Sequence, residues 1–240
     1  MTMAIETRPV RYEGPGGPFE GVLAWDTAAE APHPGVMVAP NVLGLKAFDV
    51  EKAKALAALG YVGFAIDVYG AQNRPEANRE HARALMQEAE ADRRVLQARM
   101  TAALDALRAQ PEADATRIGA IGFCFGGKCV LDLARSGADV AGVVSLHGVF
   151  DAPPFANAAP ISARILVLHG FDDPLAGPEA SVALGRELTA SGADWQIHLY
   201  GHAAHGFTAP GSAAPGIGYD EKADRRSWRA LCDFFEELWG

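Results

Sequence analysis

An apolar segment that runs directly into a turn of small residues, and then into a helical pattern, constrains the fold of this chain most. It reads Arg117-Ile-Gly-Ala-Ile-Gly-Phe-Cys124-Phe-Gly-Gly127. The apolar residues before Cys124 predict a buried strand, and the spacing after Gly127 predicts a helix. Gly122 and Gly126, two residues before and after the cysteine, allow strand and helix to pack closely at a sharp corner. The segment is typical of a nucleophile elbow with cysteine in place of serine.

An elbow would hold the Cys124 thiol in open space above a sheet. The thiol would also lie at the amino end of the following helix, where N–H groups and the helix dipole favour an anion. The alternative is that Cys124 is a small buried hydrophobe, as most free cysteines are. An acid and a histidine that follow in the order required by such a site favour the reactive thiol.

Apolar runs alternate with helical patterns from residue 35 onwards, which is the signature of βαβ units. The expected class is therefore α/β, with a mostly parallel central sheet and helices on both faces. Strands are expected at Gly35–Ala39, Tyr61–Ile66, Arg117–Phe123, Val140–Leu146, Arg164–His169 and Trp195–Tyr200. Before them, Thr7–Tyr12 and Glu20–Trp25 flank the turn Gly14-Pro-Gly-Gly17 and predict an antiparallel hairpin at the sheet edge.

Helical spacing fills the segments between these strands. Helices are expected at Phe48–Leu59, Pro75–Ala109, Gly127–Ser136, Pro178–Ser191 and Asp220–Leu238. The second is either two helices or one long bent helix. Gly60, Gly137 and Gly192 are expected to end the helices before them. The Gly206–Gly218 segment is interpreted either as a loop that shapes the pocket or as a solvent loop.

Composition narrows the class of partner. The chain has 240 residues, 49% of them hydrophobic, and no linker divides it, so residues 1–240 are expected to form a single domain. A net charge of −9 argues against nucleic acid as a partner. No basic leader or membrane-length apolar stretch is present, so a cytoplasmic location away from membranes is expected. Three cysteines, an odd number, fit reduced thiols.

A candidate acid follows the predicted strand that ends at His169. The next residues are Gly170-Phe-Asp172-Asp173-Pro174, and open α/β sheets assemble their sites at the carboxyl ends of strands. Asp173 is preferred because the proline after it holds its backbone extended. Asp172 is interpreted as a turn-capping residue.

Two candidate bases follow the last predicted strand, in Tyr200-Gly-His202-Ala-Ala-His205-Gly-Phe207. His205 is preferred because small neighbours let its ring swing over the elbow, and His202 is interpreted as a loop residue. His205 would take the Cys124 proton and later protonate the leaving group, while Asp173 would fix the imidazole tautomer. The expected chemistry is acyl transfer through a thioester.

Such a reaction needs two N–H donors for the developing oxyanion. One is expected from Phe125 and the other from Val42, in the loop after the first parallel strand. His147 and His169 each precede a glycine at a strand end and are candidates for the pocket wall, although hydrogen-bonded structural histidines are the preferred interpretation. Because metal-ligand spacings and phosphate-binding glycine loops are missing from the sequence, we expect no metal and no cofactor.

These motifs together resemble the dienelactone hydrolases of the α/β-hydrolase superfamily, from about Gly35 to Leu238. The similar motifs are Gly-Phe-Cys124-Phe-Gly-Gly, Gly170-Phe-Asp-Asp173, His205-Gly-Phe207 and Gly60-Tyr-Val-Gly-Phe-Ala-Ile-Asp67-Val-Tyr69. The resemblance implies an α/β-hydrolase fold and a cofactor-free hydrolase of small-molecule esters and lactones. A monomer or weak homodimer is expected.

Two departures from the family pattern bear on the substrate. Family members usually place a glutamate, which holds the resting thiol, where this chain has Asn41. They also bind a substrate carboxylate with two arginines; Arg79 matches one by position, whereas the other falls near Thr208 and Ala209. Loss of one cation should weaken binding of a carboxylated lactone. Neutral esters or lactones are therefore expected, with neutral phosphotriesters as a candidate side activity. The expected pocket residues are Asn41, Arg79, His147 and Phe207.

Two other functions compete with hydrolysis. A redox or sensing protein would use Cys124 as an exposed reactive thiol and would need a resolving thiol. Cys129, five residues further along the same helix, would point to a different face. A non-catalytic binding module on the same fold is the second alternative, because a fold does not fix a function.

Overall fold

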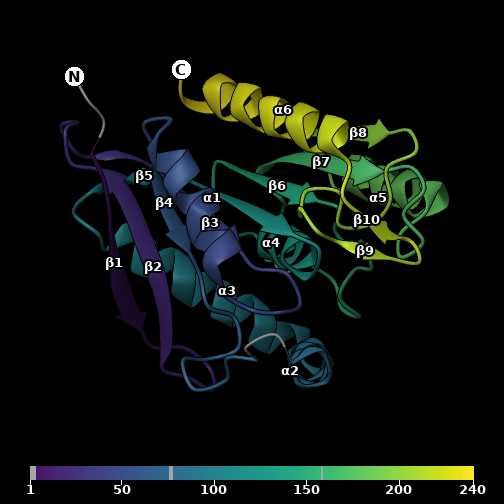
Figure 1. Ribbon diagram of the computed structural model, residues 1–240, viewed down its shortest axis with the longest axis horizontal. Helices are drawn as coiled ribbons and strands as arrows, with labels where there is room; N and C mark the ends of the chain where they lie inside the picture. The colour runs from purple at the N-terminus through teal and green to yellow at the C-terminus, as the bar shows by residue number, and fades with distance from the viewer. Residues whose placement is uncertain (1–3, 76–77, 158) are drawn as a thin grey trace. The chain divides into compact units, whose positions relative to one another are not determined.

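The computed structural model describes residues 4–75, 78–157 and 159–240, and the chain divides into two compact units, residues 1–121 and 122–240. Strands β1 to β8 form an eight-stranded sheet in the order β1-β2-β4-β3-β5-β6-β7-β8, and β9 and β10 form a separate pair (Figure 1). The single domain expected from the sequence stays a prediction. Each unit is described below by itself.

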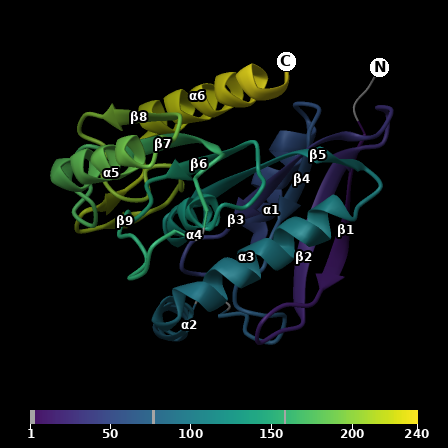
Figure 2. The same ribbon diagram turned by 180° about the vertical axis from the view of Figure 1, so that it is seen from behind.

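The described residues of the first unit form five strands and three helices. They are β1 (Ile5–Tyr12), β2 (Phe19–Asp26), β3 (His33–Ala39), α1 (Ala47–Ala57), β4 (Val62–Ala65), α2 (Arg79–Ala91), α3 (Arg93–Arg108) and β5 (Ala113–Phe123), whose last residues enter the second unit. β1 and β2 form the expected antiparallel hairpin, β2 continues antiparallel to β4, and β3 runs parallel to β4. α1 and α3 lie on opposite faces of these strands (Figures 1 and 2).

The break between α2 and α3 decides between the two expected arrangements of this helical region. Asp92 has an extended backbone, and its carboxylate accepts hydrogen bonds from the N–H groups of Arg94 and Val95. A side chain that caps a helix in this way marks the start of a new helix. The region therefore forms two helices rather than one bent helix.

The second unit contains the remaining elements. They are α4 (Phe125–Arg135), β6 (Gly142–Leu146), β7 (Arg164–Gly170), α5 (Pro178–Ala190), β8 (Trp195–Tyr200), β9 (Ala213–Ala214), β10 (Ile217–Gly218) and α6 (Glu221–Trp239). β6, β7 and β8 are parallel neighbours. α6 covers one face of these strands, and α4 and α5 cover the other (Figures 1 and 2). The carboxyl ends of parallel strands thus meet at one edge, where sites in α/β folds are built.

The structure confirms the predicted α/β class, with helices on both faces and an antiparallel edge hairpin. Gly60, Gly137 and Gly192 have φ values of 90°, 77° and 72°, as expected for residues that end helices. The short β9–β10 pair was not expected, because two-residue strands rich in alanine and glycine give no alternating pattern. No helix among the described residues has the length and hydrophobicity to cross a bilayer.

Candidate active site

Cys124 occupies the corner between β5 and α4. Its φ of 55° and ψ of −113° are strained for a side chain other than glycine. Its N–H donates to the carbonyl of Leu146 at 3.0 Å, and its own carbonyl accepts from Gly127 at 3.0 Å. A Cβ atom on Gly122 would overlap the backbone of Gly126, so only glycine lets strand and helix approach here. The corner is thus rigidly held, and Cys124 is partly exposed.

His205 and Asp173 form a buried hydrogen-bonded pair. Nδ1 of His205 lies 2.8 Å from Oδ2 of Asp173, and the two residues are 4% and 2% exposed. The other carboxylate oxygen of Asp173 accepts from the N–H of Leu175 at 2.8 Å, which fixes the carboxylate. A carboxylate only accepts hydrogen bonds, so Nδ1 of His205 carries the proton in this bond. Nε2 is then the ring nitrogen that can take up or release a proton. Nε2 has no nitrogen or oxygen partner among the described residues.

The Cys124 thiol is the second group that acts on the imidazole of His205. Burial lowers the pKa of this ring, but hydrogen bonding to Asp173 and Cys124, together with their charges, outweighs burial and raises the pKa of His205 to about 10. The protonated form of the His205 ring is therefore favoured between these two side chains. The His205 ring thus interacts with both Asp173 and Cys124, the residue at the elbow.

The loop after His205 folds back onto it. The N–H of His205 donates to the carbonyl of Gly216 at 3.1 Å, and its carbonyl accepts from the N–H of Gly218 at 3.0 Å. Gly216, with φ of 72°, also packs against the ring of Pro174, the residue after the acid. The β9–β10 hairpin therefore contacts both His205 and Pro174, the residue that follows Asp173. Of the two interpretations of this segment, the described contacts favour the loop that shapes the site.

His147 lies against the His205 ring, and Phe207 lies against His147. The His147 ring is 5.3 Å from that of His205 and 5.1 Å from that of Phe207, in edge-to-face arrangements. Nε2 of His147 lies 2.8 Å from the hydroxyl of Thr208. Phe207 is fully buried and packs with Ala203. His147 thus packs on the His205 ring within the core and Phe207 packs behind His147, and their predicted place on the pocket wall stays a prediction.

The alternatives for acid and base lie apart from this pair. His202 and Asp172 are exposed, and their side chains approach each other at 3.7 Å.

His169 is buried beside Asp173, with Nε2 at 2.7 Å from the carbonyl of Ala176. Burial lowers the pKa of His169, against the opposing charge of Asp173. A neutral His169 is thus the hydrogen-bonded structural histidine that the sequence favoured.

The loop of the first unit that contains Asn41 and Val42 is firmly organised. Oδ1 of Asn41 accepts from the N–H of Leu43 at 2.9 Å and from Nζ of Lys46 at 3.0 Å. The carbonyl of Val42 accepts from the Tyr69 hydroxyl at 3.0 Å. Because the Asn41 carbonyl oxygen is fully engaged, its NH₂ group is the end that can meet a ligand.

Two further residues of the first unit, Lys46 and Arg79, refine the sequence interpretation. Lys46 was not expected; its ammonium group lies 3.2 Å from the buried carboxylate of Asp49, which places a cation beside Asn41. Arg79, the predicted partner of a substrate carboxylate, is the exposed first residue of α2. Among the residues that the structure describes, no three His, Cys, Asp or Glu side chains gather as a metal-binding group.

A mostly parallel sheet with a strained cysteine at a strand–helix corner and a buried histidine–aspartate pair defines an α/β-hydrolase. The sequence profile of the dienelactone hydrolase family matches residues 19–239. The chain therefore belongs to this family, and it is a hydrolase of the carboxylic ester and lactone class. The predicted family is confirmed, and the match begins earlier than Gly35.

Individual relatives agree with this assignment. An uncharacterized protein of Caenorhabditis elegans, K02A2.1, is 39% identical over 150 residues, which are 59% of this chain and 93% of that protein. The carboxymethylenebutenolidase of Pseudomonas putida is 27% identical over 217 residues, 88% of each chain. A solved structure, the dienelactone hydrolase-like promiscuous phosphotriesterase P91 from metagenomic libraries, has a TM-score of 0.93 at 39% identity and covers 99% of this chain and 100% of its own.

The β9–β10 hairpin is expected to position the base. A Cβ atom on residue 216 would come within 2.5 Å of Pro174, whereas one on residue 211 would meet nothing within 4 Å. Both glycines have positive φ, so alanine costs about 1 kcal/mol of backbone strain at either. Gly216→Ala should lower kcat/KM for p-nitrophenyl acetate about tenfold or more, and Gly211→Ala less than about threefold. Equal losses in the two variants would contradict a positioning hairpin.

The protonation of His205 can be measured directly by NMR titration of its ring. The imidazole should stay protonated at neutral pH and lose its proton only as the pH rises through about 10. Cys124→Ala removes the thiol that contributes to raising the pKa of His205, so this pKa should fall. His169 serves as the reference in the same spectra, because burial lowers its pKa below the ordinary value of a histidine. An ordinary His205 titration that Cys124→Ala does not change would contradict this coupling.

Proposed function

We propose that the chain hydrolyses neutral esters and lactones through a thioester on Cys124. His205 is the general base and acid, and Asp173 orients it. The observation that carries this proposal is the 2.8 Å hydrogen bond between His205 and Asp173, in a ring whose pKa the Cys124 thiol also raises. These two features support the assignment of all three residues to one site.

The first half of the reaction forms the thioester. His205 holds the proton of Cys124, and the thiolate sulfur attacks the carbonyl carbon of the ester, so an S–C bond forms and the carbonyl oxygen becomes an oxyanion. The oxyanion collapses, the C–O bond to the alcohol breaks, and His205 gives its proton to the departing oxygen. With a lactone, the alcohol stays tethered to the acyl group.

The second half regenerates the thiol. Neutral His205 takes a proton from water, and the hydroxide attacks the thioester carbon. The C–S bond then breaks, the acid product leaves, and the sulfur returns to its pairing with His205. Asp173 stabilises the imidazolium in both halves without itself becoming protonated.

Two backbone N–H groups are proposed for the oxyanion. Phe125 is the first residue of α4, and the first N–H groups of a helix point beyond it, toward the positive end of the dipole. Val42 follows Asn41 in the turn closed by Gly44 N–H on the Asn41 carbonyl at 2.9 Å, and this turn does not use the N–H of Val42. These features support the assignment of Phe125 and Val42 as donors.

The preference for neutral substrates rests on the side chains at the two departures from the family pattern. Asn41 replaces an acid with an amide whose oxygen is already bonded. Thr208 is buried on His147, and Ala209 is apolar, so neither supplies the second cation of a carboxylate clamp. Arg79, which is exposed, is the one arginine that remains of the family's two-arginine clamp. A neutral acyl group needs no such clamp.

Hydrolysis of neutral phosphotriesters is proposed as a side activity. The thiolate would attack phosphorus, an S–P bond would form and the P–O bond to the aryl group would break, and water would then cleave the S–P bond. The phosphoryl oxygen gains negative charge in this transition state, as the carbonyl oxygen does. The similarity to P91, a promiscuous phosphotriesterase, supports this activity.

The thioester is tested by trapping it. With p-nitrophenyl acetate, mass spectrometry after acid quench should show an acetyl group on the peptide that contains Cys124. Cys124→Ala should lower the turnover of the ester and of paraoxon by about a thousandfold, whereas Cys232→Ala, which changes a thiol on α6, should leave both near wild type. Unchanged turnover in Cys124→Ala would refute the nucleophile.

Substrate charge is tested with matched lactones that differ in one carboxylate. The wild type should prefer the neutral lactone. Ala209→Arg adds a cation at the departure from the family pattern and should lower KM for the carboxylated lactone about tenfold, the value of one charge-assisted hydrogen bond of about 1.4 kcal/mol. Ala209→Gln is the control of similar size. Equal effects of the two substitutions would show that charge does not select the substrate.

The redox alternative finds less support. Cys129 is fully buried in α4, so it is poorly placed to resolve an oxidised Cys124. A non-catalytic module would not need the His205–Asp173 pair.

The cytoplasmic location and the monomer or weak homodimer stay predictions from the sequence.

A further inference from the structure

β8 is the last strand of the sheet, so one side of its backbone has no neighbouring strand in the part of the chain that the structure describes. The N–H of Ile165 donates to the carbonyl of Asp194, and the N–H of Phe171 donates to the carbonyl of Tyr200. In a parallel ladder, every second residue of a strand directs its backbone groups toward the same neighbouring strand. Because Asp194 and Tyr200 face β7, the N–H and C=O groups of Trp195, Ile197 and Leu199 point outward, away from β7. β8 contains neither proline nor lysine, the residues that commonly protect an edge strand.

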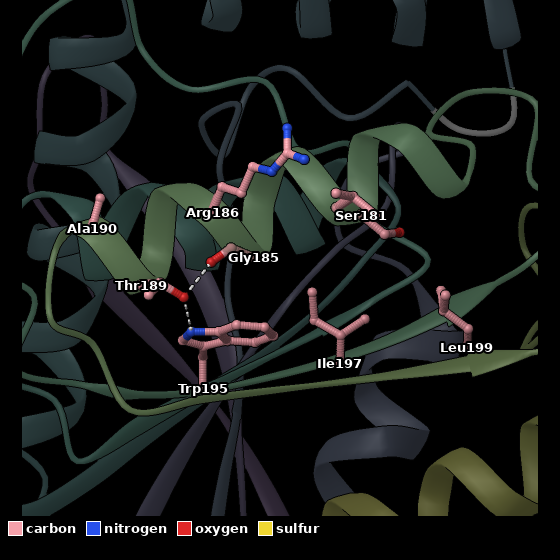
Figure 3. A pocket seen from close by; sticks show the side chains of 9 residues that line it. Ser181, Gly185, Arg186, Thr189, Ala190, Trp195, Ile197 and Leu199 are labelled. Carbon is pink, nitrogen blue, oxygen red and sulfur yellow. Dashed lines mark hydrogen bonds between the residues drawn. The ribbon is translucent and has the colours of Figure 1, made fainter.

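The side chains of the same three residues line a hollow between β8 and α5, the β8 groove (Figure 3). Its volume is about 590 Å³, within the range of ligand sites. Its residues are Ser181, Val182, Gly185, Arg186, Thr189, Ala190, Trp195, Ile197 and Leu199. Val182 and Leu199 are 54% and 41% exposed, which is high for aliphatic side chains on neighbouring elements.

The floor of the β8 groove is fixed. The indole N–H of Trp195 donates to the hydroxyl of Thr189 at 3.2 Å, and that hydroxyl donates to the carbonyl of Gly185 at 2.8 Å (Figure 3). A Cβ atom on Gly185 would come within 2.9 Å of the indole, so glycine allows the ring to lie against the helix. The hollow is therefore preformed.

Arg186 gives the β8 groove its charge. It is exposed on the α5 side, and its guanidinium group points away from β8 (Figure 3). Across residues 4–75, 78–157 and 159–240, no acidic side chain pairs with it, although the chain carries a net charge of −9. A second copy bound to the same edge would bring another Arg186 to the same groove. An acidic ligand therefore complements the charge of the groove, whereas a second copy of the chain does not.

We propose that the β8 groove binds an extended, acidic and apolar peptide segment of a partner protein. The segment adds a strand to β8 by pairing with the outward groups of Trp195, Ile197 and Leu199. Alternate apolar side chains enter the hollow, and one carboxylate meets Arg186. This surface is distinct from the catalytic residues, so the proposal stands apart from the proposed reaction.

Hydrogen exchange measured by NMR tests this pairing with a defined probe, the acetylated and amidated peptide Val-Thr-Val-Glu-Val-Thr. Exchange at Trp195, Ile197 and Leu199 should slow at least tenfold on addition of the peptide. Exchange at Gln196 and His198, whose backbone groups face β7, should not change. The same peptide with lysine in place of glutamate should bind at least fivefold more weakly.

Matched variants test the groove. Leu199→Lys should weaken peptide binding at least tenfold, and His198→Lys, on the other face of the strand, less than twofold. Val182→Lys on α5 repeats the test away from the strand, and amide protection at Gln196 verifies that β8 remains in the sheet. Arg186→Glu should reverse the preference and favour the lysine peptide.

Three outcomes would overturn the proposal. The first is unchanged exchange at 1 mM peptide, about the limit of useful affinity. The second is equal binding of the glutamate and lysine peptides to the wild type. The third is a dimer seen by sedimentation in the wild type and lost in Leu199→Lys, which would assign the edge to a second copy.

Discussion

The hydrogen bond between Nδ1 of His205 and Asp173 is the interaction on which the site depends. It fixes the tautomer and leaves Nε2 for the thiol, and together with the interactions of Cys124 it outweighs a burial that would otherwise favour the neutral ring. Both residues follow strands of one parallel set, yet 31 residues lie between them in the chain, so only the fold brings them together. Cys124 is presented to this pair by a backbone conformation that packing must maintain.

Local chemistry in the sequence was enough to predict the parts of the site that depend on short segments. The elbow follows from the spacing of Gly122 and Gly126 around Cys124, since only glycine fits where the strand and helix touch. Asp173 was separated from Asp172 by the proline that follows it, and the structure places Asp173 beside His205. The alternation of strands and helices likewise gave the class of fold.

Features that depend on contacts distant in sequence were not predictable in this way. The pairing of His205 with Gly216 and Gly218 joins a loop to a two-residue strand, and such a strand has no periodicity to detect. Nor does the sequence reveal that Lys46 holds the oxygen of Asn41, because a lysine five residues away is equally compatible with a solvated side chain. Arg79, chosen by position alone, is exposed.

The loop between His205 and α6 is held at its two ends, while its tip touches little. A Cβ atom at Gly211 would meet open space, whereas one at Gly216 would strike Pro174. Length and composition at the tip are therefore free to vary during evolution or in a designed library. An enzyme built in this way can acquire new specificity by changing the tip while the His205–Asp173 pair stays in place.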